Sequence, residues 1–260
     1  MSAPAVKIED LKVQYGTEVV LNHMNLTIEQ GQFVCLLGPS GCGKSTMLRI
    51  IGELTSHHGG EVRVGERPTW EAWDRLAYVF QAPRLVPWRN ALDNVVLGMQ
   101  LRGMPGSKDE LRQQAREALA TVDIEHLAKR PAHVLSGGEQ QRVAIARGLA
   151  VKPEILLMDE PFSALDVQTR HQLRDEIVRL WERTGLTIIF VTHDVDEAII
   201  VGNRIVVFSP KPTTMLADIP VDLSHPANPL SPQFQLIRKQ IVAKFGDDPA
   251  VEELTESNLG

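Results

Sequence analysis

The fold class is decided by the eight residues Gly38-Pro39-Ser40-Gly41-Cys42-Gly43-Lys44-Ser45. They follow the apolar run Phe33–Leu37 and precede an amphipathic stretch, residues 45–51, so they join a predicted strand to a predicted helix. They match the pattern G-x-x-x-x-G-K-[ST], in which glycines let several backbone N–H groups face one anion. A chance match is expected in roughly one chain in a hundred of this length. The position between strand and helix therefore favours a phosphate-binding loop.

In such a loop the lysine and the serine have separate tasks. Lys44 would reach the outer phosphates of a nucleotide, and the Ser45 hydroxyl would bind Mg²⁺. The positive end of the following helix would add to the attraction for the anion. We therefore predict nucleotide binding at this loop.

Further apolar runs indicate a sheet around this strand. They alternate with amphipathic stretches, which is typical of a parallel sheet covered by helices. Two segments nearer the start, residues 6–15 and 19–28, alternate apolar and polar side chains as strands of a half-exposed antiparallel edge would. We predict an α/β fold with a mixed sheet and an antiparallel β edge. The predicted core strands after Phe33–Leu37 are residues 76–80, 155–158, 187–191 and 205–208.

The middle of the chain has a helical pattern. Residues 92–134 carry no strong strand signal, and Ser107 with Glu110 forms a capping-box pattern. The apolar residues that follow at helical spacing are Leu111, Ala115, Ala118, Leu119 and Val122. We expect one domain, 1–260. Its α/β core is 1–84 and 137–209, its inserted helical subdomain is 85–136, and its C-terminal extension is 210–260. The acidic end of that extension, 246–260, is expected to be a solvated terminus.

The run Ile155-Leu156-Leu157-Met158-Asp159-Glu160 supplies two carboxylates at the end of a buried strand. Hydrolysis of a phosphoanhydride needs a magnesium anchor and a group that positions the attacking water. We assign Asp159 to the metal and Glu160 to the water, as general base. An Asp-Glu pair that merely opens a helix is the alternative. The phosphate-binding loop in the same chain favours the chemical interpretation.

Two other polar residues terminate apolar strands. Gln81 follows residues 76–80 and His193 follows residues 188–192. The carboxyl ends of parallel strands form the edge where open α/β sheets bind ligands. We expect both side chains to lie at that edge with the phosphate loop and the two carboxylates.

A second predicted anion site lies in Leu135-Ser136-Gly137-Gly138-Glu139-Gln140-Gln141-Arg142. Ser136 and Glu139 form a capping box that opens a helix, and the glycines expose backbone N–H groups at its positive end. This second site has neither a lysine nor metal ligands. A head-to-tail pair of chains, each completing the other's site, would explain two phosphate sites in one chain.

These motifs together resemble the ABC ATPases over roughly residues 5–210. Residues 38–45 resemble the family's Walker A motif, 155–160 its Walker B motif, and 135–140 its signature motif. Gln81 resembles the Q-loop glutamine, residues 163–166 the D-loop, and His193 the switch histidine. Tyr15 lies where the family has an aromatic ring that stacks on adenine. The resemblance implies a P-loop (RecA-like) core, ATP and Mg²⁺ as cofactors, and ATP hydrolysis coupled to transport.

The residues that the resemblance and the chemistry assign fall into three groups. The catalytic residues would be Glu160, His193, Lys44 and Gln81. The metal ligands would be Ser45, Gln81 and Asp159. The nucleotide would contact Tyr15, Gly38, Pro39, Ser40, Gly41, Cys42, Gly43, Lys44, Ser45 and Thr46, with Ser136, Gly137, Gly138 and Asp166.

Finer features resemble the importer branch that serves nitrate, sulfonates and taurine. The segments that carry this resemblance are 85–90, 93–95, 162–170 and 194–199, with the proline-rich stretch after Ser209. It implies a homodimer that works with permease subunits, one of whose cytoplasmic helices would meet the surface around residues 81–88. The ATPase would be peripheral, at the cytoplasmic face of the cell (inner) membrane. A periplasmic or lipid-anchored solute-binding protein would complete the complex. The alternative is an ABC ATPase that moves no solute, such as one of cluster assembly.

The bulk composition agrees with these expectations. The chain has 260 residues, a formal net charge of -6 and a pI near 5.8, so we expect no nucleic-acid partner. No apolar run approaches the length of a membrane span, and the first residues lack the pattern of a secretory signal. We therefore expect a cytosolic chain that reaches the membrane through a partner. A third functional class, a P-loop kinase, is disfavoured because such an enzyme would not need the signature segment 135–142.

The two cysteines suggest free thiols in a reducing compartment. Cys42 lies two residues before Lys44 and beside a helix N-terminus. A cation and a helix N-terminus both favour thiolate, so we expect the Cys42 pKa to be lowered and its thiol to react selectively. The alternative is that Cys42 is merely a small residue tolerated in a tight loop. Cys35 should be buried and inert.

Overall fold

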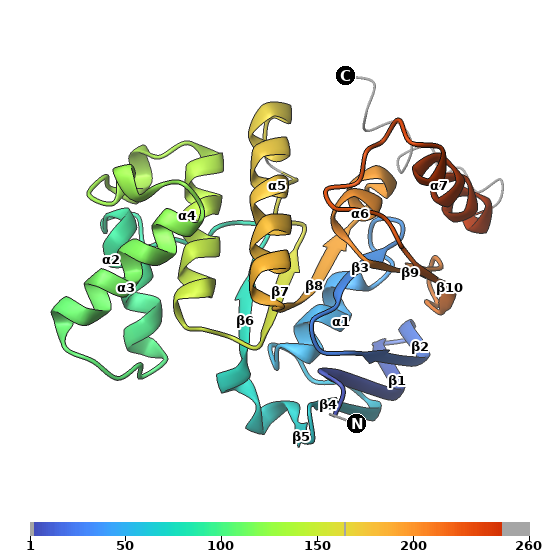
Figure 1. Cartoon of the computed structure of the whole chain (residues 1–260). Coiled ribbons are helices and arrows are strands. Elements are labelled where there is room, and N and C mark those ends of the chain that lie inside the picture. Colours follow the sequence, from blue (N-terminus) through green and yellow to red (C-terminus); the bar gives the residue numbers. More distant parts are fainter. Residues whose placement is uncertain (1–2, 164, 246–260) are drawn as a thin grey trace. The chain divides into compact units, whose positions relative to one another are not determined.

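The computed structural model describes residues 3–163 and 165–245, drawn as ribbons in Figure 1. The chain divides into two compact parts. The terminal part comprises Met1–Trp73 and Gly185–Gly260, and the middle part comprises Asp74–Thr184. The expectation for residues 246–260 lies outside the described residues. The predicted division into core, 85–136 subdomain and extension stays a prediction.

The terminal part contains the predicted antiparallel edge. Strand β1 (Val6–Tyr15) lies between β2 (Glu18–Ile28) and β4 (Gly59–Val64), and it pairs antiparallel with both. The short β5 (Arg67–Pro68) continues this sheet beyond β4. Buried and exposed residues roughly alternate along β1 and β2, so one face of the sheet is apolar, as the sequence pattern predicted. Two 3₁₀ turns, η1 (Thr69–Glu71) and η2 (Trp73–Arg75), follow the sheet.

A second sheet in the terminal part is built around β3 (Phe33–Leu37). Strand β3 pairs in parallel with β8 (Thr187–Thr192) and with β9 (Arg204–Phe208), and β10 (Met215–Pro220) pairs antiparallel with β9. Every residue of β3 and β8 is buried. Continuous apolar strands of this kind belong to parallel sheets covered on both faces. The predicted strands at 33–37, 187–191 and 205–208 are thus confirmed.

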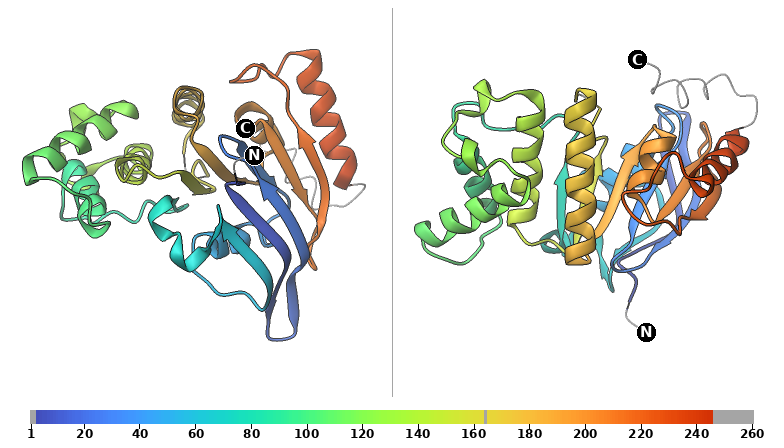
Figure 2. Two further views of the ribbon diagram at one scale, coloured as in Figure 1. Left: turned by 60° about the horizontal axis from the view of Figure 1, so that its bottom comes forward. Right: turned by 45° about the horizontal axis from the view of Figure 1, so that its top comes forward.

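The described residues of the terminal part form three α-helices. Helix α1 (Lys44–Ile51) follows β3 directly, and α6 (Val195–Val201) follows β8. Helix α7 (Pro232–Phe245) lies beside β10 and packs on α6, as both views of Figure 2 show. The Arg238 Nε of α7 is 2.7 Å from Asp196 Oδ1 of α6. The ion pair fastens the C-terminal helix to the helix that follows His193.

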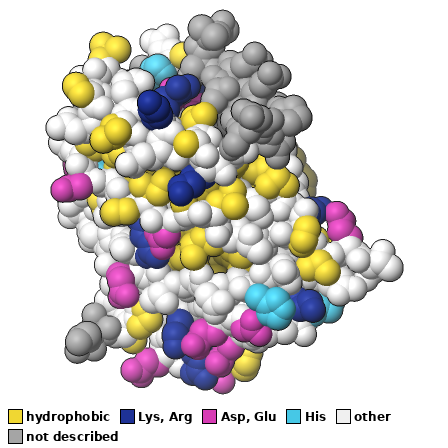
Figure 3. Space-filling view, turned by 90° about the vertical axis from the view of Figure 1, so that its right-hand side faces the viewer, with side chains coloured by type: hydrophobic (Ala, Val, Ile, Leu, Met, Phe, Trp, Pro, Cys, Tyr) yellow, Lys and Arg dark blue, Asp and Glu magenta, His cyan; other side chains and the backbone are white. Residues whose placement is uncertain are grey.

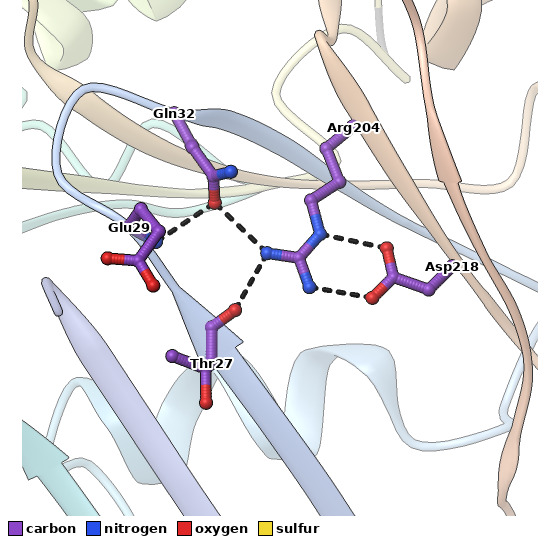
Figure 4. Close-up of polar contacts among 5 residues, drawn as sticks. All are labelled: Thr27, Glu29, Gln32, Arg204 and Asp218. Atoms are coloured by element: carbon purple, nitrogen blue, oxygen red, sulfur yellow. Dashed lines mark hydrogen bonds and ion pairs between the residues drawn. The ribbon is translucent and has the colours of Figure 1, made fainter.

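Arg204 joins the two sheets of the terminal part, as Figure 4 shows. Its guanidinium makes a bidentate pair with the Asp218 carboxylate on β10, at 2.8 and 2.6 Å. Its remaining nitrogen donates to the Thr27 carbonyl of β2 at 2.7 Å and to the Gln32 side chain at 3.0 Å. A planar guanidinium suits this arrangement because its donors diverge in a fixed plane. The Arg204 side chain therefore links β9 to both β10 and β2.

Strand β10 is the edge strand of its sheet. Figure 3 shows apolar side chains gathered across the middle of one face of the molecule, with charged side chains mainly below them. On β10, Met215 is 40% exposed and Leu216 is 37% exposed, and Leu236 of α7 is 59% exposed. The ion-paired Asp218 and the terminal Pro220 make this edge a poor template for another strand.

In the middle part, the described residues form two paired parallel strands and four α-helices. The strands are β6 (Leu76–Val79) and β7 (Ile155–Asp159). The helices are α2 (Ala91–Leu101), α3 (Lys108–Thr121), α4 (Gly137–Ala150) and α5 (Val167–Thr184). Short 3₁₀ turns, η3 (Glu125–Leu127) and η4 (Ala132–Val134), lie between α3 and α4. Helices α2, α3 and α4 pack on one another (Figures 1 and 2).

Both predicted capping boxes are present. The Ser107 hydroxyl accepts from the Glu110 N–H at 3.3 Å, and the Glu110 carboxylate accepts from the Ser107 N–H at 2.6 Å. Ser136 and Glu139 make the same reciprocal pair at 3.2 and 2.7 Å. Each pair satisfies two backbone donors that the helix itself leaves without partners. Among the helices of residues 3–163 and 165–245, none combines the length and the apolar character of a membrane span.

Candidate nucleotide-binding and hydrolytic site

The loop between β3 and α1 depends on its glycines. Gly41 has φ +76° and Gly43 has φ +109°, a region that side chains with a Cβ seldom adopt. At Gly43 a Cβ would lie 2.9 Å from the side chains of Val20 and Leu21. At Gly38 it would lie 2.9 Å from the Phe208 carbonyl oxygen. The backbone can therefore curl here only because these positions have no side chain.

Lys44 is folded into this loop. Its Nζ donates to the carbonyl oxygens of Gly38 at 2.6 Å and Pro39 at 2.9 Å, and the residue is only 3% exposed. Helix α1 begins at Lys44 with no side-chain cap, so its first N–H groups point toward the loop. Ser45 and Thr46 occupy the first turn of the same helix. A helix N-terminus, a lysine and a hydroxyl together form a cradle suited to phosphate.

Thr213 supports this cradle, and the sequence analysis did not single it out. Its hydroxyl donates to the Cys42 carbonyl of the loop, and the residue is fully buried. Its backbone N–H donates to Val20 and its carbonyl accepts from Asn22, both at 3.0 Å. The loop is thus tied to β2 through a residue 171 positions away. A contact of this range leaves no local pattern in the sequence.

The prediction for the Cys42 pKa was wrong. Burial raises the pKa of this thiol, and the nearby Lys44 ammonium, 3.9 Å from the sulfur, offsets that effect only in part. Cys42 is only 2% exposed, so desolvation of the thiolate outweighs the attraction of the cation. Cys35 is fully buried, and its pKa is raised well above its usual value, chiefly by burial.

His193 lies in a turn that hydrogen bonds hold on both sides. The Thr192 hydroxyl donates to the Glu197 carboxylate at 2.6 Å and accepts from the Asp194 N–H at 3.0 Å. The Asp194 carboxylate caps α6 by accepting from the Glu197 N–H at 2.9 Å. The buried carboxylates therefore fix the path of the chain around His193. Tyr15 ends β1 in the same part, with half of its surface exposed.

In the middle part, the predicted carboxylates terminate β7. Asp159 is 3% exposed, and its Oδ2 accepts a hydrogen bond from the Tyr78 hydroxyl at 3.1 Å. Glu160 follows with φ +43°, in the left-handed region that few non-glycine residues adopt. The chain thus bends at Glu160, directly after the strand that ends in Asp159.

Gln81 lies close to this turn through Ser163. Its amide nitrogen donates to the Ser163 hydroxyl at 3.1 Å, and that hydroxyl donates to the Glu160 carbonyl at 3.0 Å. The structure therefore brings together Gln81 and the backbone of Glu160, as the strand-end argument expected. Ser163 is the connecting residue, and the sequence analysis gave it no role of its own.

The predicted second anion site opens α4. Ser136 and Gly137 are exposed at the N-terminus of this helix. At Gly138 a Cβ would lie 2.4 Å from the Thr169 side chain of α5, so this glycine permits the close approach of the two helices. Asp166 accepts from the Thr169 N–H at 3.0 Å. Hydrogen bonds from the Thr169 side chain and backbone lower the pKa of the Asp166 carboxyl.

The loop between β6 and α2 is held by side chains of α4 and α2, and it exposes Trp88. Arg147 of α4 donates to the carbonyls of Pro83 at 2.8 Å and Arg84 at 2.9 Å. The buried Asn94 side chain accepts from the Val86 N–H at 2.7 Å and donates to the Val86 carbonyl at 3.2 Å. Trp88 is 80% exposed. Trp88 therefore lies on a surface loop whose backbone is held by hydrogen bonds from α2 and α4.

Comparison with known proteins gives consistent matches. The family described as ABC transporter matches residues 21–163. The aliphatic sulfonates import ATP-binding protein SsuB 2 of Paracoccus denitrificans (strain Pd 1222) is 43% identical over 242 residues, which cover 93% of this chain and 92% of that protein. The taurine import ATP-binding protein TauB of Escherichia coli O157:H7 is 39% identical over 220 residues, which cover 85% and 86%.

A solved structure matches as well. It is the dimeric, post-hydrolysis state of the ATP-binding cassette MJ0796 bound to ADP and Pi. Its TM-score is 0.75 at 35% sequence identity, and the match covers 83% of this chain and 98% of that one. The fold expected from the motifs is therefore confirmed.

Proposed function

Because this chain belongs to the ABC transporter ATP-binding proteins, we propose that it is the ATP-hydrolysing subunit of an importer for a small solute. The solute would be of the nitrate, sulfonate or taurine kind, since relatives named for sulfonate and taurine import share about 40% of its residues. The observation that carries this proposal is that one chain contains both a phosphate cradle around Lys44 and a strand that ends in Asp159 and is followed by Glu160.

The phosphate cradle would bind the nucleotide. Gly41 and Gly43 give the loop its curl, and the N-terminus of α1 and Lys44 would meet the phosphates. Tyr15, half exposed at the end of β1, would stack on the base. Residues 38–46 would thus supply the binding energy, and the charge that develops during hydrolysis would be met by donors already in place.

The carboxylates would serve hydrolysis. Glu160 would accept a proton from the attacking water, and His193 and Gln81 would help to place that water and the terminal phosphate. The sharp turn at Glu160 and the Gln81–Ser163 hydrogen bond support these roles, because they fix the two residues against one strand end.

The oxygen donors present suit Mg²⁺. This ion prefers hard oxygen ligands and uses one or two carboxylates beside substrate phosphates. Asp159 offers a buried carboxylate, Ser45 a hydroxyl, and Gln81 an amide oxygen, since its amide nitrogen is used on Ser163. When bound, the ion would neutralise phosphate charge.

A homodimer would complete each site. Ser136 and Gly137 are exposed at the N-terminus of α4, where they could meet the phosphates of a second chain's nucleotide. The dimeric cassette structure with the same fold supports this arrangement. Asp166 and Gly138, next to this helix end, would line the interface.

The permease would dock on the loop that carries Trp88. Residues 81–90 join Gln81 to this exposed tryptophan, and Arg147 and Asn94 hold the loop firmly. The ATPase would thus be peripheral, at the cytoplasmic face of the membrane. Import would also require a solute-binding protein outside the membrane. The relatives named as import proteins favour this assignment over an ATPase of cluster assembly.

Reconstitution tests the proposal. The chain is purified with a candidate permease from the same organism, placed in proteoliposomes, and assayed for ATP hydrolysis with a candidate solute-binding protein. We expect hydrolysis to rise when a sulfonate or nitrate is added with the binding protein, and to vanish with Glu160→Gln. Hydrolysis without any association with a permease would instead favour the non-transport alternative.

A further inference from the structure

We propose that Tyr78 is a positioning residue that orients the Asp159 carboxylate toward the metal-nucleotide complex. The inference rests on the proposed function, because it takes Asp159 as the metal ligand. Tyr78 belongs to none of the motifs described above. Its hydroxyl lies 3.1 Å from Asp159 Oδ2 and can donate a hydrogen bond to it.

The sheet register fixes where this hydroxyl lies. Strands β6 and β7 pair in parallel, with Tyr78 opposite Leu157. Residues two apart on a strand share a face, so Asp159 lies on the face of Leu157, one diagonal step from Tyr78. The contact between hydroxyl and carboxylate therefore follows from backbone pairing and not from a mobile loop.

A stack of side chains holds the tyrosine ring. The ring centroids of Tyr78 and Phe80 are 4.4 Å apart, at an interplanar angle of 36°. The Arg84 guanidinium covers the Phe80 ring at 4.0 Å from its centroid. Stacked rings and a cation over a ring face are both attractive arrangements. The stack restricts rotation of the ring, so the hydroxyl keeps its direction.

A tyrosine hydroxyl is suited to orient an ionised carboxylate that serves as a metal ligand. A carboxylate only accepts hydrogen bonds, and a phenol is a neutral donor near pH 7. A donor on Oδ2 restrains the rotation of the carboxylate, so the group would keep one orientation as a metal ligand. Partners of this kind hold metal ligands in place, and their loss typically costs about 10- to 100-fold in metal affinity or activity.

The same stack connects this carboxylate to the loop that would meet the permease. Arg84 lies in residues 81–90, and its carbonyl is held by Arg147. A shift of that loop would therefore act on Phe80 and Tyr78, and through the hydroxyl on Asp159. Tyr78 is thus placed to make the geometry of the metal ligand depend on the docking loop.

The test measures how much Mg²⁺ strengthens nucleotide binding. The affinity of the purified full-length chain for a fluorescent ATP analogue is titrated with Mg²⁺ and with EDTA, for the parent and for Tyr78→Phe. This substitution removes one oxygen and keeps the ring stack. We expect affinity in EDTA to be unchanged, and the gain from Mg²⁺ to fall by about tenfold. In hydrolysis, the Mg²⁺ concentration for half-maximal rate should rise more than kcat falls.

Control variants separate the possible failures. Thr121→Val removes a hydroxyl that donates to the Glu117 carbonyl on α3, and should keep the parent's gain from Mg²⁺. Phe80→Leu removes the ring contact with Tyr78 and should also reduce the gain from Mg²⁺. This second variant keeps the proposal testable if Tyr78→Phe does not fold. Asp159→Asn should abolish the gain.

Two results would overturn different claims. If Asp159→Asn abolishes the gain from Mg²⁺ while folded Tyr78→Phe retains it, Tyr78 has no positioning role and the assignment of Asp159 stands. If Asp159→Asn itself retains the gain, Asp159 is not the metal ligand, and that part of the proposed function fails together with the inference.

Discussion

Glu160 has a backbone conformation that costs free energy. A non-glycine residue at φ +43° is uncommon, and such conformations persist where surrounding contacts hold them. Here the Ser163 N–H and hydroxyl both donate to the Glu160 carbonyl, at 3.3 and 3.0 Å. These two hydrogen bonds hold the bend at Glu160, directly after the strand that ends in Asp159.

We predict that Glu160→Gln binds ATP normally and hydrolyses it far more slowly. Glutamine keeps the size and hydrogen-bonding capacity of glutamate but is not a base, and one general base is worth about 10²–10⁴-fold in rate. Nucleotide affinity and single-turnover hydrolysis are measured on the same preparation, with Glu182→Gln on the exposed surface of α5 as the control. A Glu160→Gln rate within a few-fold of the parent would remove Glu160 from this role.

We predict that Cys42 is alkylated slowly in the folded chain, in contrast to the expectation from its sequence neighbours. Burial raises the pKa of its thiol, so less thiolate is present at neutral pH than in a free cysteine. Each unit by which the pKa rises lowers the thiolate fraction by about tenfold. Because the folded pKa is raised, the labelling rate should keep rising with pH above ~8.5, where a free thiol levels off.

Peptide mapping after maleimide treatment, with and without denaturant, measures this rate for each cysteine. Cys35 is the internal comparison, since its pKa is raised further by complete burial. Rapid labelling of Cys42 in the folded chain at pH 7 would show that its thiol is more accessible and more acidic than the structure indicates.

At the scale of elements, Arg147 links helix α4 to the docking loop. Its guanidinium donates hydrogen bonds to the Pro83 and Arg84 carbonyls. Burial lowers the pKa of this guanidinium from the ordinary arginine value. Its aliphatic stem lies against α2, where a Cβ on Gly98 would approach Arg147 Cγ to 2.7 Å. The residue thus connects two helices and the loop that carries Trp88.

We predict that Arg147→Met loosens this loop. Methionine keeps the apolar stem but leaves two carbonyls without their donors, which costs roughly 1–3 kcal/mol per group if no water replaces them. Hydrogen exchange of residues 83–90 should accelerate. Arg112→Met is the matched control, because it breaks a partly exposed pair with Asp93 that is worth at most about 1 kcal/mol. Unchanged exchange in Arg147→Met would contradict the bracing role.

The elements were predicted where the pattern is local. The apolar runs, the two capping boxes and the glycine-rich loop each contain their own signal, and all are confirmed in the structure. Thr213, Ser163 and Tyr78 were missed because they act through partners on other elements. The Cys42 pKa was predicted wrongly because sequence proximity shows the cation but not the burial. Strand β10 and helix α7 were not predicted within the extension after Ser209.

At the scale of the whole molecule, the central claim is that two chains complete each ATP site. One chain carries a lysine-bearing cradle around Lys44, and it also exposes Ser136 and Gly137 at a second helix N-terminus. A head-to-tail dimer would place the helix N-terminus with Ser136 and Gly137 of one chain against the Lys44 cradle of its partner. Each chain would then be inactive alone, and ATP would be the link between the two chains.

Mixing two defective chains tests this claim most directly. One carries Ser136→Arg and the other Lys44→Ala, both with Glu160→Gln to retain ATP, and they bear tags of different mass. A head-to-tail dimer of one chain of each kind has one site with both phosphate-binding elements intact, while the other site has lost both. We predict an ATP-dependent mixed dimer with one ATP per two chains, and no ATP-dependent dimer from either variant alone. If mixing leaves each defect unchanged, Ser136 acts within its own chain and the composite site does not exist.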